Sequence, residues 1–163
     1  MNKHYDVSVV SIHDRTADGR LLAFDLKEIL KVLEEYLAQW IWYVPALEAF
    51  GSENIEAACD AVEAAQGKGV WFSSTELLEL AGDITQTVDG EFLAFSVDVD
   101  RQALGESDLN LAHFQQNKIA LAILSVDSSY FEVYTKDPSV EAAIRQHFED
   151  VRLENQEVCF SMD

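Results

Sequence analysis

The chain has 163 residues, of which 48% are hydrophobic, and its 30 acidic and 11 basic residues give a formal net charge of −19 at pH 7. This length is typical of one domain, here 1–163, and the hydrophobic share is that of a folded protein with its own core. The acidic surplus argues against nucleic acids and anionic membranes as partners, because proteins meet phosphate groups through basic patches.

The ends and the cysteines of the chain bear on its compartment. The N-terminal residues contain no apolar run behind a basic start, so we expect no secretory signal. No apolar stretch approaches the roughly 20 residues of a membrane span. The two cysteines, Cys59 and Cys159, lack a histidine at zinc-ligand spacing. These features predict a cytoplasmic protein without a metal or cofactor, in which Cys59 is a buried thiol on a helix.

The first third of the chain is predicted to form one strand, one short strand and a long helix. Tyr5–Ile12 is rich in β-branched residues, and Leu21–Phe24 follows an Asp-Gly turn. Asp25 and Glu28 have the spacing of a capping box, which marks the start of a helix that we expect to end before Pro45. Apolar residues then recur at helical spacing, at positions Leu26, Ile29, Leu30, Leu33, Leu37, Trp40, Ile41 and Val44.

The middle of the chain is predicted to contain two helices and a short buried segment. Glu53–Ala65 has helical periodicity and stops at a Gly-Lys-Gly sequence. Val70–Phe72 is apolar and short. Ser73 and Glu76 form a second capping box, so a third helix should begin there.

The second half of the chain is dominated by turn signals between apolar runs. Asp89-Gly90 separates Ile84–Val88 from Glu91–Val99, which predicts a β-hairpin. Ile119–Val126 and Tyr130–Thr135 flank an Asp-Ser-Ser turn and predict a second strand pair.

A final helix and a last strand complete the prediction. Asp137-Pro138 places a capping residue before a proline at the first helical turn, and Glu157–Phe160 has the composition of a short strand. Strands joined by tight turns favour an antiparallel sheet. We therefore expect a single α+β domain, a mainly antiparallel sheet built from hairpins with about four helices packed against it.

Sequence motifs of common enzymes are missing, so we assign no catalytic residues. The chain contains no Walker A, dinucleotide-binding, zinc-protease, nucleophile-elbow or EF-hand pattern. Alternation along residues 93–100 would place Asp98 and Asp100 side by side on a strand, about 7 Å apart. This pair is open to three interpretations: a solvated face, a partner contact, or a hard-cation site that would need further oxygen ligands.

The acidic residues cluster in the middle third of the chain, where no Lys or Arg occurs between Gly69 and Asp100. Surplus charge of one sign favours solubility but also steers a partner of opposite charge. On a helical wheel, Trp42 lies opposite Leu33 and would be exposed, as interface tryptophans often are; inward rotation at a frayed helix end is the competing interpretation. The candidate partner-binding residues are Glu76, Glu79, Asp83, Asp98, Asp100 and Trp42.

The composition thus favours an acidic cytosolic protein-binding module, an inhibitor or immunity-type neutraliser of a basic partner protein. Bacterial immunity proteins, which block toxic nucleases or similar basic effectors, are an example of this class by composition alone. The alternative is a small-molecule-binding or regulatory domain with an aromatic-lined pocket around Trp40, Tyr43, Trp71 and Phe72. An enzyme with dispersed carboxylates ranks third, and homo-oligomerisation is left open.

Overall fold

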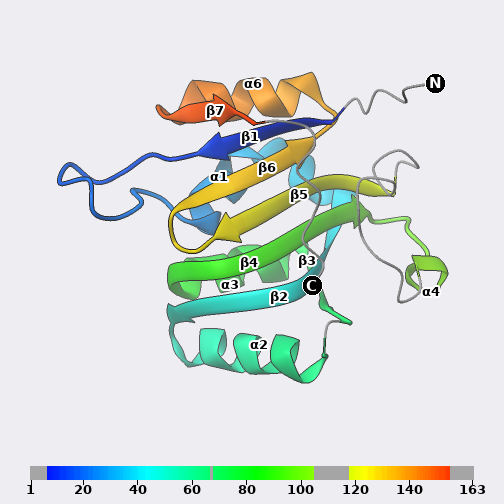
Figure 1. Cartoon of the computed structure of the whole chain (residues 1–163). Helices are drawn as coiled ribbons and strands as arrows, with labels where there is room; N and C mark the ends of the chain where they lie inside the picture. The colour runs from blue at the N-terminus through cyan, green and yellow to red at the C-terminus, as the bar shows by residue number, and fades with distance from the viewer. Residues whose placement is uncertain (1–6, 67, 105–117, 155–163) are drawn as a thin grey trace.

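The computed structural model describes residues 7–66, 68–104 and 118–154, and these form a seven-stranded antiparallel sheet with helices against it (Figure 1). In sheet order β3-β2-β4-β5-β6-β1-β7, the strands are β3 (Val70–Ser73), β2 (Trp40–Gly51), β4 (Ile84–Ser96), β5 (Ile119–Val126), β6 (Tyr130–Thr135), β1 (Ser8–Ile12) and β7 (Val151–Leu153). The predicted α+β class with a mainly antiparallel sheet is therefore confirmed.

Four helices of seven or more residues lie within the described part of the chain, as predicted. They are α1 (Leu26–Val32), α2 (Glu53–Ala64), α3 (Ser74–Asp83) and α6 (Pro138–His147), with a 3-10 turn η1 (Glu34–Gln39) after α1 and the short α4 (Arg101–Leu104) after β4. In Figure 1, α1 and α3 lie behind the sheet, α6 lies beyond β7, and α2 lies beyond β2 at the opposite edge. The larger hydrophobic cluster fills the space between these helices and the sheet, and a second cluster lies on the other sheet face.

The structure corrects the long first helix. α1 ends at Val32, and after η1 the chain enters β2, which continues through Pro45 to Gly51. Trp42 and Val44 pack in the helix-side core, whereas Ile41 and Tyr43 pack on the opposite face, which is the two-residue period of a strand. The helical spacing of the apolar residues was ambiguous here, because nearly every residue of 40–44 is apolar and both faces of the sheet are covered.

The predicted hairpin at Asp89-Gly90 is also wrong. β4 runs without a turn from Ile84 to Ser96 and pairs with β2 on one side and β5 on the other. A Cβ atom on Gly90 would lie 2.8 Å from the ring of Phe92, so glycine provides space for an aromatic side chain rather than a turn.

The remaining turn signals are confirmed where they mark a hairpin. β5 and β6 are joined by the three residues Asp127, Ser128 and Ser129. The first two have positive φ angles, and the Ser129 N–H donates to the Val126 carbonyl at 2.8 Å. Leu21–Phe24 forms only an isolated bridge, between Leu22 and Arg15. The predicted strand Glu157–Phe160 lies outside the described residues, and β7 was not predicted.

Candidate functional site

Exposed carboxylates gather on α2 and α3, which are adjacent in the fold. Both helices are amphipathic: Ile55, Val62, Leu77 and Leu80 are buried, and the acidic residues lie on the opposite faces. We call the exposed set the acidic ridge, and it consists of Glu53, Glu56, Asp60, Glu63, Glu76, Glu79 and Asp83. The three α3 carboxylates are thus exposed as the sequence predicted, and α2 adds four that sequence analysis did not assign.

The two helices of the acidic ridge meet at a tight joint. The backbone N–H of Ser52 donates to the Asp83 carbonyl at 3.3 Å, and the Asn54 side-chain amide donates to the Asp83 carboxylate at 3.2 Å. A Cβ atom on Gly51 would lie only 2.2 Å from the Asp83 carbonyl oxygen, so the turn between β2 and α2 requires glycine at this position. The joint places the first turn of α2 beside the last residue of α3, Asp83.

Local helix energetics are unfavourable at part of the acidic ridge. Glu56 follows Glu53 by three positions and Asp83 follows Glu79 by four, and like charges at these spacings repel. Asp83 also places a negative charge at the negative end of the α3 dipole, and neither helix has a basic residue in its last turn. The ion pairs Glu141–Arg145 and Asp150–Arg152 lie on other elements. Folding therefore accounts for Glu76, which completes the capping box of α3, and for Glu53 and Glu56 in the first turn of α2, but not for Glu79 and Asp83.

Asp98 and Asp100 are exposed, but they do not share a strand as predicted. β4 ends at Ser96, where the chain turns: the Val99 N–H donates to the Ser96 carbonyl at 3.0 Å. Next in the chain, Arg101 stacks over the Trp71 ring of β3 at 5.0 Å and lowers the pKa of Glu76 as the smallest of several causes, the largest being the backbone hydrogen bond at Ser73. This loop therefore lies near the start of α3, and its arginine offsets part of the negative charge there.

Trp42 is not an exposed anchor. Its side chain is 0% exposed, and its Nε1–H donates to the Ser74 hydroxyl at 3.0 Å. It packs edge-to-face against Trp40, with ring centroids 5.8 Å apart. The competing interpretation, in which Trp42 turns inward, is right that the side chain is buried. It is wrong about the reason, because residue 42 lies in a strand and not at a frayed helix end.

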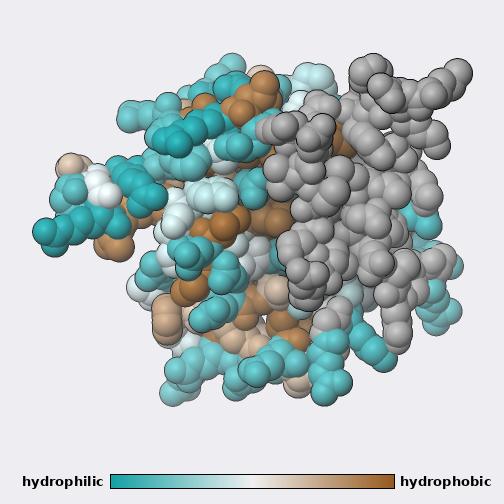
Figure 2. Space-filling model, in the orientation of Figure 1, coloured by the Kyte–Doolittle hydropathy of each residue, from teal (hydrophilic) through white to brown (hydrophobic). Residues whose placement is uncertain are grey.

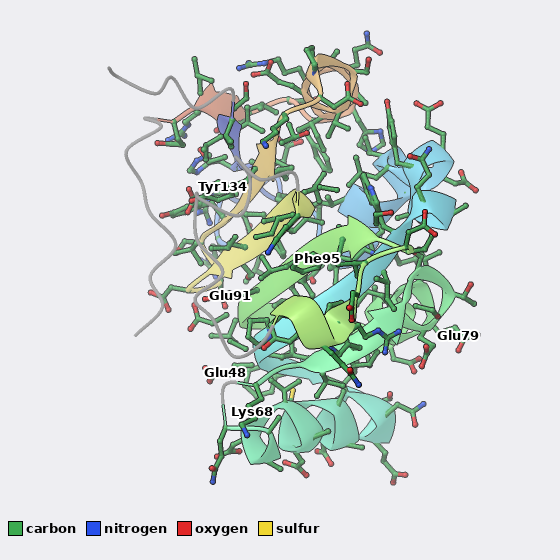
Figure 3. The ribbon with its side chains drawn as sticks, turned by 90° about the vertical axis from the view of Figure 1, so that its right-hand side faces the viewer. Glu48, Lys68, Glu79, Glu91, Phe95 and Tyr134 are labelled. Atoms are coloured by element: carbon green, nitrogen blue, oxygen red, sulfur yellow. The ribbon has the colours of Figure 1, made fainter. Side chains whose placement is uncertain are left out.

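The aromatic residues of the alternative hypothesis do not line one pocket. Trp40 and Phe72 pack in the helix-side core, whereas Tyr43 and Trp71 pack on the opposite face, where their ring centroids are 5.0 Å apart. Figure 3 shows Phe95, which contacts Trp71, within the sheet, and Glu79 on the opposite, helix side. The four aromatic side chains therefore pack in the two hydrophobic clusters and do not form one ligand pocket.

A buried polar cluster on β1, β6 and the residues after β7 was missed by sequence analysis. The Ser11 hydroxyl donates to Glu154 at 2.5 Å and lies 2.8 Å from His13 Nε2, and the His13 ring stacks on Tyr130. Burial, followed by the charge of Arg152, lowers the pKa of His13. Ser11 is 0% exposed and bridges an imidazole and a carboxylate, whereas in a catalytic triad the carboxylate orients the imidazole. The cluster therefore has the geometry of a structural bridge between β1 and the residue after β7.

Glu132 lies on the same sheet face and is 8% exposed. It accepts a hydrogen bond from the Tyr134 hydroxyl at 3.3 Å, and burial raises its pKa above the ordinary value of 4.5. As pH rises past this ordinary value, the unfolded chain loses the proton first and the folded chain retains it. Stability is therefore lost as pH rises from about 4.5 through the raised pKa.

Replacing Glu132 by glutamine is expected to raise the free energy of unfolding at pH 7 by about 1 kcal/mol, because a buried charge is removed and the Tyr134 hydroxyl keeps an acceptor. The gain should shrink at pH 4.5, because the raised pKa of Glu132 leaves more of the folded chains protonated there than at pH 7. Urea denaturation at both pH values measures the difference, with the exposed Glu149→Gln as the control. An equal gain at both pH values would contradict the assignment.

Metal ligands and membrane spans complete the description. Within residues 7–66, 68–104 and 118–154, no three His, Cys, Asp or Glu side chains are placed to hold a metal ion. No helix in the same ranges is both long enough and apolar enough to cross a bilayer. The chain matches no family model, and no curated protein and no solved structure is significantly similar to it.

Proposed function

We propose that this protein binds a basic protein partner through the acidic ridge, and acts as an inhibitor or neutraliser of that partner. The observation that supports the proposal is the set of seven exposed carboxylates on two joined helices. We also propose a cytoplasmic location, in line with the sparse cysteines.

The electrostatics of the acidic ridge are suited to partner selection. Single-sign clusters raise association rates with oppositely charged surfaces and disfavour partners of like charge. The exposed charges act over a Debye length of about 8–10 Å at 0.1–0.15 M salt, so this attraction is sensitive to salt. A neutraliser of a basic effector needs this kind of fast, selective association.

The proposal predicts that the triple variant Glu76→Gln, Glu79→Gln, Asp83→Asn loses a basic partner that wild type captures from host lysate at low salt. The stability of the variant should stay close to that of wild type, because the lost charge of the capping residue Glu76 opposes the relief of repulsion between Glu79 and Asp83. Affinity capture at low and high salt, with the eluate identified by mass spectrometry, measures the binding. Thermal unfolding measures the stability.

A control variant separates a specific surface from the effect of net charge. Asp18→Asn, Asp127→Asn and Glu149→Gln remove the same charge from exposed positions on other elements. This control should capture the partner as wild type does. If both triple variants lose the partner equally, the binding is general ion exchange and the acidic ridge is not its site.

A further inference from the structure

An ordered arm, residues 14–23, projects from the sheet between β1 and α1 (Figure 1). Figure 2 shows it on the left as a mainly hydrophilic projection with a few hydrophobic atoms on its lower side. Within the arm, the Thr16 N–H donates to the Leu21 carbonyl at 2.9 Å. At the base of the arm, the Arg15 guanidinium donates to the Ser129 carbonyl at 2.8 Å. The arm is thus held by a hydrogen bond of its own and by one to the turn between β5 and β6, so its shape is fixed.

A pocket of about 160 Å³ lies between the arm and the start of β4. Its lining is mainly apolar, and comprises Leu21, Leu22, Phe24, Asp25, Thr85, Gln86, Thr87 and Ser128. Leu21, which forms one wall, is 59% exposed, so the fold itself leaves this leucine largely in water. Pockets for drug-sized molecules have volumes of about 300–1,000 Å³. The smaller pocket beside the arm therefore has the size for a single side chain.

The backbone of β4 is irregular where it borders the pocket. Opposite β2, the strand carries one extra residue at Thr85 and another at Val88, so the two register shifts enclose Gln86 and Thr87. β-Bulges re-aim side chains and are frequent beside functional sites. Gln86 lines the pocket and is half-buried, and its side-chain amide makes no hydrogen bond among the residues that the structure describes. The donors and the acceptor of this amide are thus available to an occupant of the pocket.

The pocket continues to the end of α3, where the acidic ridge has its last carboxylate. A second hollow of about 300 Å³ shares Phe24 and Thr85 with the pocket and extends to Ala81 and Gly82 of α3. A Cβ atom on Gly82 would meet nothing within 4 Å, so no contact in the described structure requires glycine, a poor helix former, at this position. Next in the chain is Asp83 of the acidic ridge. A partner bound at this end of the acidic ridge would therefore reach the pocket.

We propose that the pocket binds one aliphatic side chain of the basic partner, such as leucine, whose neighbours along the partner chain are lysine or arginine. This inference rests on the proposed function and specifies an anchor that exposed carboxylates do not provide. Charges at the rim of an interface mainly set association rate and selectivity, whereas side chains buried in pockets carry most of the affinity. Leu21 covers the aliphatic side chain, the Gln86 amide bonds to the partner backbone, and Asp83 attracts a flanking basic residue.

Three capped tripeptides test the anchor and its flanks, namely Lys-Leu-Lys, Lys-Ala-Lys and Glu-Leu-Glu. The readout is the NMR signals of the Leu21 and Leu22 methyl groups, which line the pocket. Lys-Leu-Lys is expected to shift these signals saturably, with a Kd of about 1 mM. Lys-Ala-Lys should bind about ten-fold more weakly, because it carries the same charge but lacks the side chain that fills the pocket. Glu-Leu-Glu should also bind about ten-fold more weakly, because the acidic ridge repels it.

Two exposed leucines provide a matched pair of variants. Leu21→Asn should weaken the binding of Lys-Leu-Lys about five-fold, as seen at the Leu22 methyl groups. Leu153→Asn makes the same change on β7, outside the pocket, where leucine is 68% exposed, and should bind like wild type. Both variants should unfold at the wild-type temperature, because neither side chain is buried. Gln86→Met, which keeps the length of the side chain and loses the amide, should weaken binding about three-fold.

The outcomes separate the pocket from general attraction between charges. Equal binding of Lys-Ala-Lys and Lys-Leu-Lys, unchanged binding by Leu21→Asn, or methyl signals that do not shift with Lys-Leu-Lys each overturn the pocket. Equal binding of Glu-Leu-Glu overturns the basic flanks. Unchanged binding by Gln86→Met overturns the bond to the partner backbone.

The pocket and the acidic ridge fail in different ways. If α3 neutralisation abolishes partner capture but Lys-Leu-Lys binds no better than Lys-Ala-Lys, the proposed function stands and the pocket is not the anchor site. If Lys-Leu-Lys binds in the pocket but capture does not depend on the α3 carboxylates, the acidic ridge is overturned and the pocket remains a site for an aliphatic side chain.

Discussion

Replacing Trp42 by alanine is expected to lower the free energy of unfolding by about 3–5 kcal/mol, the usual cost of emptying a large buried aromatic site. Trp42 is fully buried in β2, and its Nε1–H donates to Ser74 at the start of α3. The Ser74 hydroxyl in turn donates to the Leu37 carbonyl of η1 at 2.6 Å. The variant therefore loosens three elements at once. Urea denaturation followed by circular dichroism measures the loss.

A second residue of the same strand provides the control. Phe50 is 62% exposed at the far end of β2, so Phe50→Ala should change stability by less than about 1 kcal/mol. Trp42→Phe should fall between the two, because it keeps most of the apolar contact and loses the hydrogen bond to Ser74. If Trp42→Ala were as stable as Phe50→Ala, residue 42 would be exposed, as on the helix that the sequence suggested.

Asp25→Ala is expected to cost about 2–4 kcal/mol, the sum of a lost helix cap and a stranded backbone donor. The Asp25 carboxylate accepts from the Leu26 N–H at 2.8 Å and forms a capping box with Glu28. It also accepts from the Thr87 N–H at 2.9 Å and the Thr87 hydroxyl at 2.6 Å. One carboxylate thus caps α1 and attaches it to β4.

The matched comparison is Ser73→Ala, which removes the capping box of α3 alone. Ser73 accepts from the Glu76 N–H at 3.1 Å, and no further strand is attached through its side chain in the described structure. This variant should lose about 1 kcal/mol. Equal losses for Ser73→Ala and Asp25→Ala would show that the bonds to Thr87 contribute nothing, and a double-mutant cycle with Thr87→Val would then show no coupling.

Elements specified by neighbouring residues were predicted well. Ser73 and Glu76 lie three positions apart, and the helix that they cap begins and packs as expected, with Leu77 and Leu80 buried. The cap Asp137 and the turn between β5 and β6 were also predicted at their observed places. In each case the residues that give the prediction lie within a few positions of the helix start or turn that they specify.

Elements whose conformation depends on segments distant in the chain were not predicted correctly. Residues 40–44 became a strand because β3 and β4 pair with them and both sheet faces are covered. Asp89-Gly90 remained inside β4 because strands lie on both sides.

The candidate site divides in the same way between sequence and tertiary structure. The sequence by itself determined the charge, the α+β class and the exposed carboxylates of α3. Only tertiary structure decided that the start of α2 lies beside the end of α3, that Asp98 and Asp100 follow the end of β4, and that Trp42 is buried. The physical reason is that helix caps and amphipathic faces are local, whereas strand pairing and burial are settled by segments distant in the chain.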